Sequence, residues 1–137
     1  MEVSAAIITD GEKVLCFRKG ESSHTYLAHR FEFPGGKVES GELPEQALVR
    51  ELEEELRYHT VPESLEFFED IDYDYEDFSV RLHYFVIRDQ YPSFVLTEHT
   101  EAKWVTIDDL LDLDWAGADL KLVKRLQERV RKSGGGL

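Results

Sequence analysis

Three glutamates in one short segment could hold a metal ion together. Glu51, Glu54 and Glu55 follow Arg50 within the run RELEEEL. In a helix at about 100° per residue, Glu54 lies about 60° to one side of Glu51 and Glu55 about 40° to the other. Like charges at this spacing repel, and oxygen ligands suit a hard divalent cation. The adjoining stripe of the same helix is apolar and consists of Leu48, Val49, Leu52 and Leu56.

A run of glutamates is also typical of a plain solvated helix face. Two further features of the sequence favour a site instead. The segment Pro34-Gly35-Gly36 precedes the acidic run, and Glu42 stands between them. A solvated helix needs neither a glycine pair nor a distant acid, so the spacing indicates a loop and a helix that act together.

The residues Gly36, Glu42, Arg50, Glu51, Leu52, Glu54 and Glu55 match the register Gly-x5-Glu-x7-Arg-Glu-apolar-x-Glu-Glu. This pattern resembles the Nudix box. The chain departs from the box at Arg57, where the box has glycine, and at Tyr58, where it has an aliphatic residue. Neither departure touches an acidic position. The segments 31–39 and 114–119 also resemble the MutT-type branch of the Nudix hydrolase superfamily, so the resemblance covers nearly the whole chain.

The resemblance implies a site for Mg²⁺ or Mn²⁺. Its implied ligands are Glu51, Glu54, Glu55, Glu98 and the backbone carbonyl of Gly35. Arg50 is expected to orient Glu51 through a charge-assisted hydrogen bond. Glu98 could ligate the metal or act as the base. The expected catalytic residues are therefore Arg50, Glu51, Glu54 and Glu98, while Glu42 is expected to anchor the loop to the helix.

The same resemblance suggests residues that contact a nucleotide. Arg18 and Lys19 end a predicted strand and could reach the phosphates, although a solvated strand end also explains Lys19. Phe33 could flank a base or belong to the core. Asp119 aligns with a position that faces the base in MutT-type relatives, and it could instead be an N-terminal cap or a first-turn acid of the last helix.

The activity implied by the resemblance is hydrolysis of a nucleoside triphosphate to the monophosphate and pyrophosphate. An ionised Asp119 accepts hydrogen bonds only, so it favours a base edge with a donor. Cytosine offers its amino group and oxidised guanine its N7–H, which gives 8-oxo-dGTP and CTP or dCTP as the two expected substrates. Two alternatives are a nucleotide-binding regulator without catalysis and a hydrolase of another nucleoside diphosphate derivative.

Composition limits the partners. The net charge of −13 over 137 residues argues against binding to a nucleic-acid polymer, because phosphate backbones are bound by basic surfaces. Cys16 is the only cysteine, which favours a reducing compartment. No apolar run approaches membrane-spanning length. These features predict a cytoplasmic protein, a monomer or homodimer, that acts on a small nucleotide.

Hydrophobic patterning predicts an α/β protein. Strands are expected at 3–9, 13–18, 30–33, 65–75, 78–88 and 103–106. Helices are expected from Pro44, at 108–112 and at 118–131. This order, with the resemblance, implies the Nudix fold, a mixed β-sheet sandwiched between helices (α/β/α). A single domain is expected at 1–131, with a flexible glycine-rich tail at 132–137.

Overall fold

The computed structural model describes residues 1–137. In chain order its elements are β1 (Glu2–Thr9), β2 (Lys13–Lys19), β3 (Phe31–Glu32), β4 (Gly35–Lys37), α1 (Pro44–Leu56), the 3₁₀ helix η1 (Pro62–Ser64), β5 (Glu66–Asp74), β6 (Ser79–Arg88), β7 (His99–Thr106), the 3₁₀ helix η2 (Ile107–Asp112) and α2 (Gly117–Ser133).

All seven strands belong to one mixed sheet. Its path is β3-β2-β1-β6-β5, while β4 pairs with β1 and β7 pairs with β2. The β1–β6 pair is parallel, and the other pairs are antiparallel. The expected mixed sheet is confirmed.

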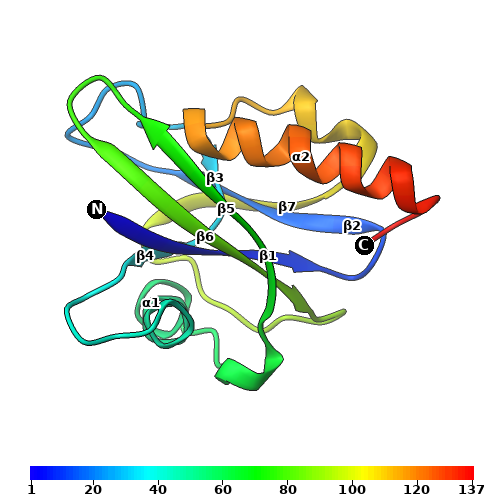
Figure 1. Cartoon of the computed structure of the whole chain (residues 1–137), viewed down its shortest axis with the longest axis horizontal. Helices are drawn as coiled ribbons and strands as arrows, with labels where there is room; N and C mark the ends of the chain where they lie inside the picture. The colour runs from blue at the N-terminus through cyan, green and yellow to red at the C-terminus, as the bar shows by residue number, and fades with distance from the viewer.

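The two long helices cover opposite faces of this sheet (Figure 1). Leu48, Leu52 and Leu56 of α1 are fully buried in one apolar cluster, and Leu122 and Leu126 of α2 are fully buried in the other. Each such leucine contributes about 1.5–3 kcal/mol by leaving water. The apolar stripe of α1 is therefore enough to hold the helix to the sheet, and its acidic stripe is left for another role.

Strand β4 was not predicted, because Pro34-Gly35-Gly36 reads as a turn. In the structure it pairs with β1 through the partners Ser4 and Gly36. A β-carbon on Gly35 would lie only 1.9 Å from the carbonyl oxygen of Ser4. Glycine is needed here for close approach of two backbones. Strand β7 also begins at His99, four residues earlier than predicted.

The departures from the box pattern leave the exit from α1 intact. Arg57 takes up the left-handed conformation, with φ 52° and ψ 32°, that glycine usually occupies at a helix end. Its backbone N–H donates to the carbonyl of Glu53 at 3.0 Å. Tyr58 is buried, and its hydroxyl donates to Asp89 at 2.7 Å. The tyrosine therefore fills an apolar position while its polar end is satisfied.

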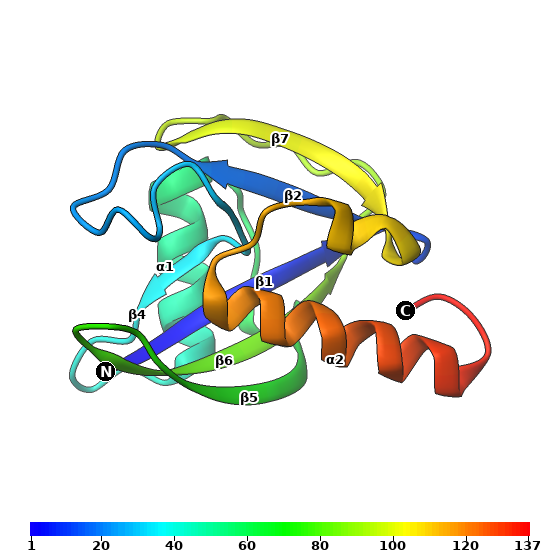
Figure 2. The same cartoon turned by 90° about the horizontal axis from the view of Figure 1, so that it is seen from above.

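The C-terminal segment folds back towards the β1–β2 turn, as Figure 2 shows. Helix α2 continues to Ser133, two residues beyond the predicted domain boundary at residue 131. The backbone N–H of Leu137 donates to Gly11 at 3.0 Å, and Arg88 donates to the carbonyl of Leu137 at 2.7 Å. The flexibility of residues 132–137 stays a prediction. None of the helices is long and apolar enough to cross a membrane.

Candidate active site

The acidic stripe of α1 lies against strand β4. A β-carbon on Gly36 would stand 2.3 Å from Cδ of Glu51, so this glycine makes room for the carboxylate. The Glu51 side chain is only 18% exposed. The glycine pair thus has two functions, since Gly35 allows β4 to approach β1 and Gly36 allows it to approach Glu51.

Arg50 joins the loop before α1 to the acidic stripe. Its Nε and Nη2 atoms each donate to a different oxygen of Glu42 at 2.9 Å, and its Nη1 donates to Glu51 at 2.8 Å. A fourth bond of 3.0 Å runs from Nη2 to the carbonyl of Lys37. The hydrogen bonds from Arg50 and from the backbone of Glu39 lower the pKa of Glu42 to about 2. Arg50 therefore fixes the Glu51 carboxylate and the loop together.

Glu55 is the most enclosed acid of the stripe. Burial is the main reason why its pKa rises to about 8, and the charges of Glu32 and Glu98 add to the rise. One of its oxygens accepts a bond of 3.2 Å from the backbone N–H of Gly35. Burial also raises the pKa of Glu51, with a smaller contribution from Glu98. The stripe thus concentrates negative charge where water screens it poorly.

Glu54 and Glu98 lie at the exposed edge of the same region. The Glu54 side chain is 60% exposed and is 3.4 Å from Nη1 of Arg50. Glu98 is exposed and immediately precedes β7. The hydroxyl of Thr97 donates to the backbone carbonyl of Glu55 at 2.6 Å, so the loop before β7 contacts α1, and the charge of Glu98 adds to the raised pKa of Glu51 and Glu55. Three of the predicted carboxylates thus share one stripe of α1, and the loop that carries Glu98 lies near it; their role as metal ligands stays a prediction.

The donor set fits a hard divalent cation in its chemistry. The four carboxylates and the carbonyl of Gly35 are all oxygen donors, which Mg²⁺ and Mn²⁺ prefer. No three carboxylate, imidazole or thiolate side chains converge on a common point in this structure. Glu51 points to Arg50, and Glu55 accepts from Gly35. Binding of a cation therefore requires rotation of these side chains.

The two predicted phosphate contacts end β2, and of these two only Lys19 lines the cleft that contains Glu98. Nε of Arg18 donates to the carbonyl of His29 at 2.9 Å. Nζ of Lys19 lies 3.9 Å from a carboxylate oxygen of Glu32. Both side chains are partly exposed, at 45% and 35%. Arg18 is therefore fixed at its Nε by a backbone carbonyl and pairs with Glu101 at 3.9 Å, whereas Lys19 makes only a long ion pair.

The two predicted base contacts lie on the α2 side of the sheet. Phe33 is buried and stacks on Trp115 with a centroid distance of 4.8 Å. Asp119 is buried and accepts a 2.7 Å bond from the hydroxyl of Tyr84. Its burial raises the pKa of Asp119 to about 7. The N-cap of α2 is Ala116 and no side chain caps this helix, so Asp119 is not the cap but is an acid of the first turn, which the alternative also allowed.

Two polar residues of this region were missed in the sequence, Glu32 and His99. They line a cleft of about 340 Å³ whose walls are Lys19, Glu21, Glu32, Glu98 and His99. Nε2 of His99 lies 2.9 Å from Glu32. The only signal in the sequence was the position of Glu32 between Phe31 and Phe33, since alternate strand residues face opposite sides.

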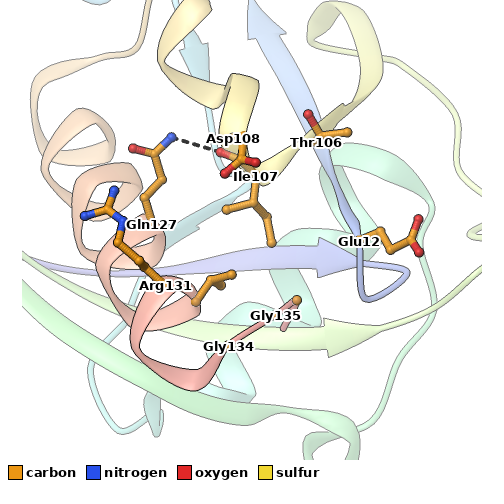
Figure 3. A pocket seen from close by; sticks show the side chains of 10 residues that line it. Glu12, Thr106, Ile107, Asp108, Gln127, Arg131, Gly134 and Gly135 are labelled. Atoms are coloured by element: carbon orange, nitrogen blue, oxygen red, sulfur yellow. Dashed lines mark hydrogen bonds between the residues drawn. The ribbon is translucent and has the colours of Figure 1, made fainter.

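Figure 3 shows a second cavity, which contains no residue of the acidic stripe. It measures about 350 Å³ and is formed by η2, the end of α2 and the β1–β2 turn. Gln127 crosses it to donate to the carbonyl of Ile107 at 2.9 Å. None of the predicted site residues lines it, and the candidate site remains the cleft beside α1.

The chain belongs to the NUDIX domain family, whose model matches residues 1–126. It is 28% identical over 128 residues to the 8-oxo-dGTP diphosphatase of Escherichia coli (strain K12), which covers 93% of this chain and 96% of that protein. It is 34% identical over 125 residues to the CTP pyrophosphohydrolase of the same strain, covering 90% and 89% of the two chains.

Solved structures agree with this assignment. The solution structure of the E. coli ORF135 protein has a TM-score of 0.74 and 31% identity, over 90% of this chain and 85% of that one. The crystal structure of MutT protein from Methanosarcina mazei Go1 has a TM-score of 0.79 at 24% identity, over 96% and 95%. The second likeness supports the fold alone. The resemblance to the MutT-type branch is thereby confirmed.

Proposed function

We propose that this protein is a divalent-metal-dependent pyrophosphohydrolase that converts a nucleoside triphosphate and water into a nucleoside monophosphate and pyrophosphate. The observation that carries the proposal is the cleft beside α1. The cleft is lined by Lys19, Glu32 and Glu98, and the charges of Glu32 and Glu98 act on the buried Glu55 of α1. A metal ion would supply the positive charge that offsets the carboxylates, and a triphosphate would supply the negative charge that pairs with Lys19.

Mg²⁺ or Mn²⁺, when bound, screens the phosphate charge and lowers the pKa of water. The chain's own residues supply the rest. Glu51, Glu54, Glu55 and the carbonyl of Gly35 would hold the cation, and Arg50 keeps Glu51 in place. Arg18 and Lys19 bind phosphate oxygens. As water attacks phosphorus, a P–O bond of the anhydride breaks and pyrophosphate leaves; the proposed acceptor of the water's proton is the exposed Glu98.

The substrate class follows from the relatives and from Asp119. The similar proteins are named 8-oxo-dGTP diphosphatase and CTP pyrophosphohydrolase. Both bases present a hydrogen-bond donor to an ionised carboxylate. We infer that Asp119 reads this donor and that Phe33 flanks the base after the buried segment around them opens.

A hydrolysis panel tests the proposed activity. The panel contains 8-oxo-dGTP, dCTP, CTP and nucleotide sugars, each with Mg²⁺ and with chelator, and both products are identified. We expect monophosphate and pyrophosphate from one of the triphosphates. Tight nucleotide binding without turnover would instead indicate a regulator, and cleavage of the sugar nucleotides alone would indicate the other class of hydrolase.

The role of Asp119 is tested separately by Asp119→Ala. Loss of one buried hydrogen bond to the base corresponds to about 1–3 kcal/mol of discrimination. We expect kcat/KM for the preferred nucleotide to fall about tenfold to a hundredfold, with much smaller losses for poor substrates. Tyr84→Phe is the control, because it removes the bond to Asp119 and keeps the carboxylate. Equal losses for all bases would show a packing role.

We also propose a cytoplasmic monomer or homodimer that binds no nucleic-acid polymer. The single cysteine, Cys16, is buried and needs no oxidising compartment. The net charge of −13 opposes a polyanion. Light scattering of the purified chain distinguishes monomer from dimer, and a larger assembly would contradict the proposal.

A further inference from the structure

We propose that His99 is a positioning residue that orients Lys19 towards the phosphates of the substrate, and that it acts through the carboxylate of Glu32. The inference rests on the proposed function and adds two residues to it. The three side chains form a series that runs from the interior to the cleft. They are exposed by 2% at His99, 22% at Glu32 and 35% at Lys19.

His99 is placed as an anchor. Its ring packs on that of Phe17 with a centroid distance of 5.3 Å. Nε2 lies 2.9 Å from an oxygen of Glu32, whereas Nδ1 is buried and has no hydrogen-bond partner. An unpaired buried nitrogen is unfavourable, and an apolar side chain would avoid it. The contact with Glu32 therefore explains why a histidine, and not an apolar residue, occupies this buried position.

The sheet brings the three residues together from three strands. Strand β2 lies between β3 and β7, with Phe17 opposite Glu32 and Lys19 opposite His99. The β2–β7 register shifts between Arg18 and Lys19. Such irregularities often re-aim a side chain near a functional site. Here the shift occurs at Lys19, the positively charged residue of the three.

Glu32 connects the series to the acidic stripe. Its two oxygens are divided between His99, at 2.9 Å, and Lys19, at 3.9 Å. All three residues line the cleft that also contains Glu98. Because buried His99 holds the Glu32 carboxylate, that carboxylate restricts where the flexible Lys19 side chain places its ammonium group. The lysine then enters the complex already close to its bound position, which lowers the entropy cost of binding.

Kinetics of four variants test the positioning role. His99→Leu removes the donor and keeps an apolar packing group, while His99→Gln can still place an N–H near Glu32. We expect His99→Leu to raise KM for the triphosphate about fivefold to tenfold with kcat changed less than threefold, and His99→Gln to recover most of the loss. Lys19→Met should raise KM similarly, and the double variant His99→Leu/Lys19→Met should be no worse than Lys19→Met alone.

Additive losses in the double variant would overturn the inference, because His99 would then act independently of Lys19. An unchanged KM with a lower melting temperature would show a purely structural histidine and would also overturn it. Calorimetric binding of inorganic pyrophosphate with Mg²⁺ gives a second measurement without turnover. If the wild type binds pyrophosphate but hydrolyses nothing, the proposed function fails, and the effect of His99→Leu on pyrophosphate affinity still decides the inference.

Discussion

Glu55 and Asp119 are acids of the two helices that cover opposite faces of the sheet, and burial has the same effect on both. The pKa of Glu55 rises to about 8 and that of Asp119 to about 7. A cation can offset the charge of Glu55, because other carboxylates surround it. Asp119 accepts a hydrogen bond from Tyr84, and the backbone of Phe33 also lowers its pKa, but burial outweighs both effects. Its ionisation must therefore weaken the folded state.

The free energy of unfolding is expected to fall as Asp119 ionises. A carboxyl group whose pKa is higher in the folded than in the unfolded state stabilises the protein below its unfolded pKa, and this stabilisation is lost as pH rises through the folded pKa. Asp119→Asn removes the effect. Between pH 5.5 and 7 the free energy of unfolding of the variant should rise relative to wild type by about 2 kcal/mol. Urea denaturation at several pH values measures the difference, and parallel curves would contradict the expected pKa.

Residue spacing predicted part of the site. The positions of Glu51, Glu54 and Glu55 follow from helical geometry alone, because all three are within five residues of one another. The contact of Glu32 with His99 spans 67 residues and depends on the order of β3, β2 and β7. No local pattern contains that order, so the sequence alone could not reveal the pair.

At the scale of elements, the fit between β4 and α1 positions the acidic stripe. Both partners were recognisable as a glycine-rich segment and a helix. Their separation is set by Gly36, whose missing side chain leaves the space that Glu51 occupies. A side chain at residue 36 must displace either the carboxylate or the strand.

Gly36→Ala therefore tests whether this fit controls activity. The new methyl group meets Glu51 at 2.3 Å, which no real contact permits, and Glu51 must turn away. We expect turnover to fall at least tenfold, with overpacking that destabilises the fold by about 1–3 kcal/mol. Gly135→Ala is the matched control, since nothing lies within 4 Å of the added carbon. Near-normal turnover in a folded Gly36→Ala protein would show that the position of Glu51 is unimportant.

The elements that the sequence predicted well are those with strong local signals. The apolar runs at 3–9 and 13–18 predicted strands that the structure contains as β1 and β2, and Thr9 of β1 pairs with Val14 of β2. Strand β4 carries no such signal, because its glycines favour a turn and its strand pairing depends on β1. The end of α1 also lacks its usual signal, because arginine stands at residue 57 where the box pattern has glycine. Arg57 adopts a conformation that its residue type disfavours, and the surrounding structure imposes it.

At the scale of the whole molecule, the charge of −13 makes the protein a polyanion that binds an anionic substrate. A divalent cation resolves this conflict and also relieves repulsion within the acidic stripe. Because only the folded chain assembles the stripe, binding of the cation stabilises the folded state by mass action.

Thermal melts with and without Mg²⁺ are expected to show this coupling. Excess Mg²⁺ should raise the melting temperature by several degrees relative to chelator, in line with about 1–3 kcal/mol of linked binding. Sodium chloride at matched ionic strength is the control, because it screens surface charge without occupying the site. Equal melting temperatures in Mg²⁺ and in sodium chloride would mean that the carboxylates form no cation site in the free protein.

The most direct test of the central claim is the Mg²⁺-dependent release of pyrophosphate from the preferred triphosphate by wild type, Glu54→Gln and Glu53→Gln. Glu53 and Glu54 are neighbours on α1 and lose the same charge, but Glu53 pairs with His59 away from the stripe. The account predicts that Glu54→Gln lowers kcat by at least a hundredfold while the protein stays folded, and that Glu53→Gln retains nearly full activity. Near-normal turnover by folded Glu54→Gln, or release of pyrophosphate in chelator, would contradict it.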